Sequence, residues 1–233
     1  MTTLAVIAAL EAELPKMQLD GHTLVTGTTG IGHEGARSVT KGILDEHGPA
    51  AVLSLGFGGG LRDGLEAGSL VVSPRLQVEG QPSLDADSSL LSAATESLKN
   101  MGVPFQLGNC LTVDQVAGNA ESKAALGSKT GAAVVDMESY WIAWEAAAAG
   151  VPWLALRAIV DPLNRALPPF VVGKDGKNIR DWVLPALKYI LTTPAGIPNL
   201  AWLGLASRKA RASIERGVGA ILPAILTQLP VTL

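Results

Sequence analysis

Cysteine is almost absent from this chain of 233 residues, because Cys110 stands alone. A lone cysteine excludes an internal disulfide and a zinc site built from several cysteines. Chains without disulfides are typical of reducing compartments, so we expect the protein to be cytoplasmic. We interpret Cys110 itself as a small buried hydrophobe rather than a catalytic thiol.

Long apolar runs, clustered histidines and an excess of positive charge are missing as well. No apolar run approaches the roughly 18 residues of a membrane-spanning helix. The first apolar run stops at Glu11 with no positive residue before it, unlike a signal peptide. His22, His33 and His47 are scattered without ligand spacing, so no metal is expected. A net charge of −3 argues against nucleic acid as a partner.

The chain is instead rich in apolar residues, with 48% hydrophobic and 17% charged positions. Apolar runs alternate with segments of helical pattern, which is typical of an α/β fold. At this length we expect one domain, residues 1–233, with a helical C-terminal extension at about 178–226. The predicted strands are 4–9, 23–26, 51–55, 70–73 and 106–111. The predicted helices are one that follows the glycines at 30–35, then 88–101, one capped by Asn119, 179–191 and 199–222.

The segment 132–161 carries the strongest pattern. It contains an apolar strand (133–135), a helix opened by acidic residues, and a second apolar strand (153–159) that runs into Asp161. Two strands that flank one helix predict a βαβ unit with parallel, neighbouring strands. Such a unit brings Glu138 and Asp161 to the carboxyl edge of the sheet, where ligands bind in α/β folds. This edge is therefore the first candidate for the active site.

Two glycine-rich stretches are candidates for ligand contact. The sequence GIGHEG (30–35) matches the dinucleotide fingerprint formally, but no acidic residue ends the following strand. We interpret it as a glycine loop whose N–H groups can approach an anion, with Arg37 nearby. The second stretch, GFGGG (56–60), predicts a loop that faces a ligand, and a tight turn is the alternative.

Four segments in order resemble motifs of the purine nucleoside phosphorylase/nucleosidase superfamily, and the resemblance covers nearly the whole chain. They are LEAEL after the first strand, LGFGGGLRDGLEAGSLVVS, VVDMESYWIA and LRAIVDP. The resemblance implies a single three-layer α/β/α domain around a mixed, twisted sheet. It also implies an enzyme that cleaves a purine nucleoside, and a homo-oligomer.

Three further segments resemble the hopanoid-associated phosphorylase group, which acts on adenosylhopane. They are CLTVDQV, then DPLNRALPPF followed by KDGK, and TPAGIPNLAWLGLASRKARASI. This resemblance implies release of adenine from a lipid-linked nucleoside, with inorganic phosphate as co-substrate and no other cofactor. The basic tail and the apolar loop at 168–172 then predict peripheral contact with the inner membrane face. The alternative is a terminal helix packed on the core or at a subunit interface, with its charges solvated.

The resemblance implies a role for each site residue. Asp161 would donate a proton to the leaving purine at N7, and Glu138 would accept hydrogen bonds from the ribose hydroxyls. Met137 would form an apolar wall beneath the sugar, with a core methionine as the alternative. Glu13 would lie near the nucleophile, where it would either position water or contact sugar and phosphate. Arg157, mid-strand, should pair with a carboxylate.

Further residues complete the predicted pockets. The substrate pocket adds Asp136, Val116 and Ala117, and the phosphate pocket consists of Gly32, Arg37, Gly58 and Gly59. The chain departs from the family at three places. Phe57 replaces a serine of the glycine stretch, Val160 replaces a serine before the catalytic aspartate, and Val116 stands where nucleosidases stack an aromatic ring on the base.

Alternatives remain open from the sequence. Asp161 could cap a turn before Pro162, and Glu138 could simply stabilise a helix N-terminus. The nucleophile could be water, as in a methylthioadenosine/S-adenosylhomocysteine-type nucleosidase. A non-catalytic nucleoside-binding protein and a Rossmann-type dehydrogenase are the two other classes.

Overall fold

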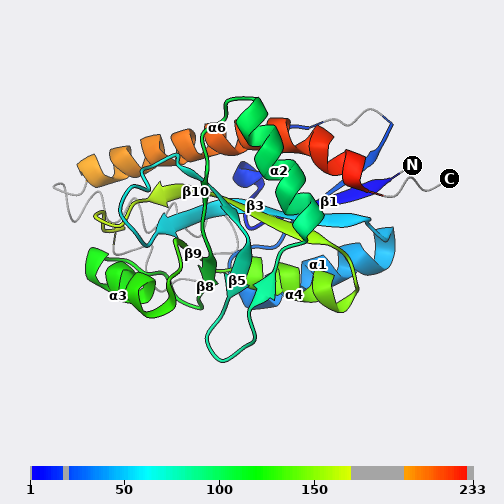
Figure 1. Ribbon diagram of the computed structural model, residues 1–233. Helices are drawn as coiled ribbons and strands as arrows, with labels where there is room; N and C mark the ends of the chain where they lie inside the picture. The colour runs from blue at the N-terminus through cyan, green and yellow to red at the C-terminus, as the bar shows by residue number, and fades with distance from the viewer. Residues whose placement is uncertain (1, 18–20, 169–196, 230–233) are drawn as a thin grey trace.

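A computed structural model describes residues 2–17, 21–168 and 197–229 (Figure 1). The predicted helix 179–191, and the loop beyond Pro168, lie outside the described residues. Within them, no helix has both the length and the apolar character needed to cross a membrane.

The core of the fold is a mixed ten-stranded sheet. Its central path runs β6-β5-β8-β9-β3-β10-β4-β7, and β1 joins β2 to one edge of β3. The strands are β1 (Thr3–Ala8), β2 (Thr23–Thr28), β3 (Ala51–Gly60), β4 (Leu70–Ser73), β5 (Arg75–Gln77), β6 (Leu84–Asp85), β7 (Gln106–Leu107), β8 (Cys110–Thr112), β9 (Val134–Asp136) and β10 (Trp153–Asp161). Parallel and antiparallel pairs both occur, which confirms the predicted mixed sheet.

Helices cover both faces of this sheet, as Figure 1 shows. Helices α2 (Ser88–Asn100) and α6 (Ile197–Gln228) pack together on one face, against side chains of β1, β3, β4 and β10. Helices α1 (His33–His47) and α4 (Ser139–Ala148) pack together on the other. Helix α3 (Ala120–Thr130) lies beside one end of the sheet. A short 3₁₀ turn, η1 (Glu11–Glu13), follows β1. The three-layer α/β/α prediction is confirmed.

The predicted helix cap at Asn119 is confirmed, and a second helix begins at a similar cap. Asn119 caps α3, because its side-chain oxygen accepts a hydrogen bond from Ser122 N at 2.8 Å. Asp87 caps α2 in the same way, from Leu90 N at 2.9 Å. The predicted strand 106–111 is in fact two short strands, β7 and β8, which pair with different neighbours. A side chain at Gly108, between them, would collide with Ala133.

The predicted pairing of β9 with β10 is wrong. Strand β3 lies between them, antiparallel to β9 and parallel to β10. All nine residues of β10 are buried, and both of its edges are taken by β3 and β4. Strand β9 therefore pairs with β3 on the edge away from β10, and with β8 on its other side.

The glycine stretch at 56–60 is also not a loop, because it continues β3 to a length of ten residues. One edge of β3 is consequently shared, with β1 paired along Ala51–Ser54 and β9 paired at Gly59 and Gly60. A Cβ atom on Gly58 would lie 2.5 Å from Val134 Cγ2. These glycines thus allow close approach of β9 to the backbone of β3.

Helix α1 offers a matched test of such close packing. A Cβ on Gly35 would collide with the Thr29 carbonyl oxygen, a backbone atom, whereas nothing lies near a Cβ on exposed Gly42. We expect Gly35→Ala to lower the free energy of unfolding by about 1–3 kcal/mol through steric strain. Gly42→Ala should raise it by about 0.5–1 kcal/mol, because alanine favours the helix. Urea denaturation of both variants checks this, and equal effects would contradict the packing.

Candidate active site

A buried ion pair between Asp136 and Arg157 stands at the centre of the candidate site. Arg157 Nε lies 2.7 Å from Asp136 Oδ2, and the two side chains are 2% and 1% exposed. Arg157 also donates to the Ser54 carbonyl oxygen at 3.0 Å, to Ser54 Oγ at 2.8 Å and to the Leu156 carbonyl at 2.9 Å. A buried charge is tolerated when it is paired and its remaining donors are used. The predicted pairing of Arg157 with a carboxylate is confirmed.

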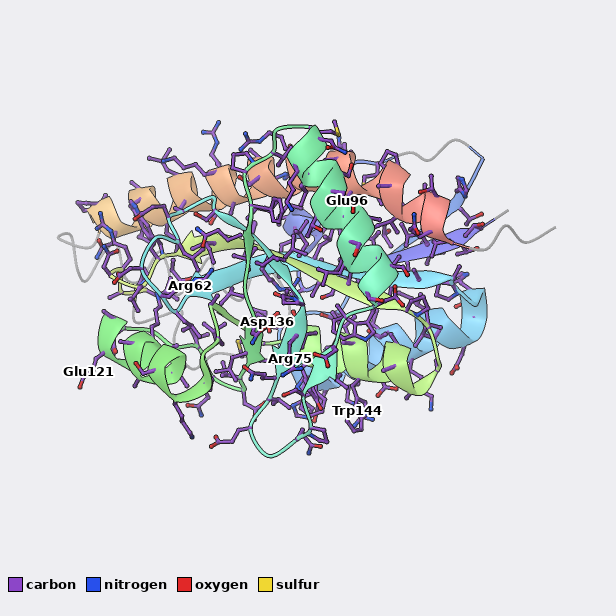
Figure 2. All side chains as sticks on the ribbon, viewed as in Figure 1. Arg62, Arg75, Glu96, Glu121, Asp136 and Trp144 are labelled. Carbon is purple, nitrogen blue, oxygen red and sulfur yellow. The ribbon has the colours of Figure 1, made fainter. Side chains whose placement is uncertain are left out.

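Asp136 joins three further groups to this pair. Its Oδ1 accepts from Thr112 Oγ1 at 2.7 Å, and its Oδ2 accepts from Ser139 N at 3.2 Å and from the Ser139 hydroxyl. Strands β8, β9 and β10 and the start of α4 are thereby tied to one carboxylate. Figure 2 shows Asp136 in the interior, among the strands. Asp136 therefore holds the surrounding strands and the start of α4 together.

Glu138 occupies the N-cap position of α4, but its side chain does not cap that helix. Its Oε1 instead accepts a hydrogen bond from Gly32 N, at 2.9 Å, at the beginning of α1. Burial, reinforced by the negative charge of Asp136, raises the pKa of Glu138 from 4.5 to about 8. Met137, beside it, is half-buried. Glu138 is therefore a buried carboxyl that can hold a proton near neutral pH.

Glu13 lies in the gap between β1 and β9 along the shared edge of β3. Its Oε1 accepts from Phe57 N and its Oε2 from Leu10 N, each at 2.8 Å. A Cβ on Gly56 would lie 3.4 Å from Glu13 Oε1 and 3.5 Å from Arg157 Cζ, so both charged groups border the same glycine. Burial raises the pKa of Glu13, while the two backbone hydrogen bonds and Arg157 oppose that rise.

Asp161 ends β10 and lies against Gly59 of β3. Gly59 is the register partner of Val135, so Asp161 and the β9–α4 junction that carries Glu138 share one region of the sheet. Burial raises the pKa of Asp161, and a lysine ammonium opposes part of the rise. That lysine is Lys123 of α3, whose Nζ lies 2.6 Å from Asp161 Oδ2.

Lys123 was missed by the sequence analysis, and no signal in the sequence marks it. It stands in the first turns of α3, a helix with a weak apolar face, where a lysine is normally solvated. In the structure its side chain is completely buried.

Other predicted residues lie elsewhere. Arg37 pairs with Glu145 across α1 and α4, at 2.6 Å, and no contact in the described residues joins it to Gly32 or Gly58. Val116 and Ala117 line an open depression of about 1130 Å³, together with one side of α3 and Leu167. Over 2–17, 21–168 and 197–229, no group of three His, Cys, Asp or Glu could hold a metal ion.

Comparison with solved structures places this fold in a defined class. A futalosine hydrolase mutant of Helicobacter pylori superposes with a TM-score of 0.73 at 16% identity, over 98% of this chain and 100% of the other. The 5′-methylthioadenosine/S-adenosylhomocysteine nucleosidase of Neisseria meningitidis, in complex with methylthio-immucillin-A, gives 0.70 at 18% identity, over 98% and 100%. At such identities the likeness concerns the fold alone. It is the nucleoside phosphorylase/nucleosidase fold.

Sequence comparison identifies the family. The family model described as the phosphorylase superfamily matches residues 13–188, and the chain belongs to this superfamily of nucleoside-cleaving enzymes. A 5′-methylthioadenosine/S-adenosylhomocysteine nucleosidase of Exiguobacterium is 30% identical over 151 residues, which are 57% of this chain and 65% of that relative. The nucleosidase of the same name from Bacillus thuringiensis is 26% identical over 167 residues, 64% of this chain and 72% of its own. A Rossmann-type dehydrogenase is thereby excluded.

The raised pKa of Glu138 predicts a specific dependence of stability on pH. A carboxyl whose pKa is higher in the folded state stabilises the fold below its unfolded value, near 4.5, and that contribution is lost as the pH rises through about 8. Glu138→Gln keeps an acceptor for Gly32 N but removes the titration. We expect the variant to gain stability over wild type as the pH rises from 4.5 to 8, by about 3–5 kcal/mol.

Thermal unfolding at several pH values measures this difference. Glu96→Gln, on the exposed side of α2 (Figure 2), is the matched control and should follow wild type throughout. A Glu138→Gln variant whose melting temperature runs parallel to wild type across this range would contradict the assignment.

Proposed function

We propose that this chain hydrolyses the N-glycosidic bond of an adenine nucleoside modified at its 5′ position, of the methylthioadenosine/S-adenosylhomocysteine type, and releases adenine. The observation that carries the proposal is a set of three buried carboxyl groups, Glu13, Glu138 and Asp161, around the end of β3, each with a raised pKa. The nucleosidase relatives support the choice of substrate class.

Asp161 is the proposed proton donor. Departure of a purine leaves an electron pair on the base, which a proton at N7 neutralises. An ordinary aspartate is ionised at neutral pH and has no proton to give. Burial raises the pKa of Asp161 and makes the protonated form accessible.

Glu138 is the proposed ligand of the ribose hydroxyls. Its Oε1 already accepts from Gly32 N, and Oε2 has no hydrogen-bond partner among the described residues. In the protonated form that burial favours near neutral pH, the carboxyl can donate to one ribose hydroxyl through Oε2 and accept from the adjacent one. Met137 is proposed as the apolar wall beneath the sugar, and Val116 and Ala117 as contacts of the purine.

Glu13 is the proposed base that activates water. As the water oxygen bonds to C1′, the C1′–N9 bond breaks, its electron pair leaves with the purine, and the water proton passes to Glu13. The neighbouring Arg157 and the N–H groups of Leu10 and Phe57 hold the carboxylate in position. Asp136 acts through Arg157, whose guanidinium it holds.

Water is favoured over phosphate by two observations. Arg37, the cation of the predicted phosphate pocket, is paired with Glu145, and the Gly32 N–H donates to Glu138. Gly58 and Gly59 border Val134 and Asp161 on the side where a Cβ would stand. The predicted homo-oligomer stays a prediction.

A substrate panel tests the proposal. Methylthioadenosine, S-adenosylhomocysteine and adenosylhopane are each incubated with and without phosphate, and adenine and the sugar product are measured. We expect adenine from the first two without phosphate. Asp161→Asn should lower turnover about 10²–10⁴-fold, as loss of a general acid does. The variant should remain folded, with a lower free energy of unfolding than Asp85→Asn, an exposed control, because buried Lys123 loses its carboxylate partner.

Absence of adenine in every wild-type reaction would reject nucleoside cleavage. Normal turnover in a folded Asp161→Asn variant would remove Asp161 from the mechanism. If adenosylhopane alone is cleaved and its sugar product carries a phosphate at C1′, the result would support the second candidate below.

The second candidate is phosphorolysis of adenosylhopane by a chain that contacts the membrane surface. The start of α6 supports it, because Ile197 and Leu205 are 48% and 59% exposed, and Arg208 and Arg211 are exposed further along the helix. Not all of the predicted apolar residues face outward. Ala206 is buried in the core, and the Trp202 ring lies under the Arg165 guanidinium, 5.0 Å away.

Co-sedimentation with anionic vesicles tests this contact. If it forms, the wild-type chain should pellet at low salt and be released at high salt, because each basic residue near the surface contributes about 1 kcal/mol. Substitution of Arg208, Lys209 and Arg211 by glutamine should abolish pelleting. The control replaces the exposed Lys41, Arg75 and Lys129 and has the same net charge. Equal pelleting by both triple variants would contradict a role for α6.

A further inference from the structure

Lys123 makes four polar contacts at the end of β10. Its Nζ lies 2.6 Å from Asp161 Oδ2, and it donates to the carbonyl oxygens of Asp161, Pro162 and Arg165 at 3.1, 3.0 and 2.9 Å. Its own side chain is 0% exposed, against 10% for that of Asp161. A lysine loses rotamer entropy and hydration when it is buried so completely, so the contacts that it gains must offset a large cost.

The position of Lys123 is set by two elements that meet there. Asn119 caps α3 and fixes its first turn, and the segment after Asp161 is held to the same place because Leu167 N donates to the Gly118 carbonyl at 2.9 Å. Helix α3 thus reaches the strand end from outside the sheet, and Lys123 connects it to the reacting carboxyl. The pairing is a product of the tertiary fold.

Among the described residues around Asp161, Lys123 is the charged group with the largest effect on its pKa. Strand β3 contributes Gly59, and β9 contributes Val135, neither of which is charged. Arg165 contributes its carbonyl oxygen to this cluster. Among the described residues, Lys123 is the charged group that sets the balance against burial.

We propose that Lys123 is a positioning residue of the reaction, which holds the Asp161 carboxyl in its reactive orientation and sets the pH range over which Asp161 carries its proton. The inference rests on the proposed function, in which Asp161 protonates the leaving purine. Lys123 itself touches Asp161 and backbone carbonyls and need not contact the substrate. Its ammonium opposes the rise that burial causes in the pKa of Asp161.

A purely structural lysine would have different consequences. Its loss would lower stability and activity together at every pH and leave in place the alkaline limb of the kcat/KM profile, which follows the titration of Asp161. A lysine that sets the proton balance shifts that titration to higher pH when its charge is removed. It also has no further effect on turnover once Asp161 can no longer donate a proton.

Three substitutions separate these cases. Lys123→Gln keeps N–H donors for the carbonyl oxygens but removes the charge, Lys123→Arg keeps the charge, and Lys123→Met removes both. The titration of Asp161 is followed by carboxyl ¹³C NMR, with the signal assigned by its absence in Asp161→Asn. Lys129→Met, an exposed position of the same helix, is the control for the titration.

We expect the Asp161 midpoint to rise by one pH unit or more in Lys123→Gln and to return toward wild type in Lys123→Arg. The alkaline limb of the kcat/KM profile for methylthioadenosine should move in the same direction, with kcat lowered about tenfold or more by loss of orientation. Adding Lys123→Gln to Asp161→Asn should lower kcat no further.

The possible failures are distinguishable. An unchanged midpoint in a folded, active Lys123→Gln variant overturns the inference and leaves the proposed function standing, as do multiplicative effects in the double variant. A wild-type chain that releases no adenine rejects the proposed function and, with it, the catalytic role of Lys123. If Lys123→Met does not fold, the glutamine and arginine variants still decide.

Discussion

The ion pair between Asp136 and Arg157 is the interaction on which the candidate site depends. Two opposite charges without access to water persist because both groups are also hydrogen-bonded, to Ser54, Thr112, Ser139 and the Leu156 carbonyl. Removal of either partner would strand a buried charge, at a typical cost of about 3–5 kcal/mol. The pair thereby holds β3, β8, β9, β10 and the start of α4 in a single arrangement, and the other carboxyl groups take their places around it.

The site contains two electrostatic environments. Burial raises the pKa of Glu13 and of Glu138, the Arg157 guanidinium opposes both rises, and Asp136 adds to that of Glu138. Asp161 stands apart from these, with its own cation supplied by Lys123. Separate partners set the proton on Asp161 independently of those on Glu13 and Glu138, and this division suits the acid and base roles that glycosidic cleavage requires. The shared edge of β3 makes this division possible.

Sequence patterns predicted most elements but not their neighbours in space. Apolar runs and caps such as Asn119 depend on contacts within a few residues, so they are readable locally. The pairing of β9 with β10 failed because chain order does not reveal that β3 comes between two consecutive strands. The prediction of a loop at 56–60 was wrong for a related reason. Glycines are common both in an open loop and in a strand that another strand approaches closely.

The sequence by itself determined the family, the mixed α/β class and the three acidic residues Glu13, Glu138 and Asp161 as candidates, because motifs and strand ends are local features of the chain. Only the tertiary structure decided how these residues are charged and held. Lys123 pairs with Asp161, which lies 38 positions away in the chain, and Arg37 pairs with Glu145, which lies 108 positions away. Contacts over such separations depend on how helices and strands pack, and burial, which sets the pKa of each carboxyl, exists only once that packing is complete.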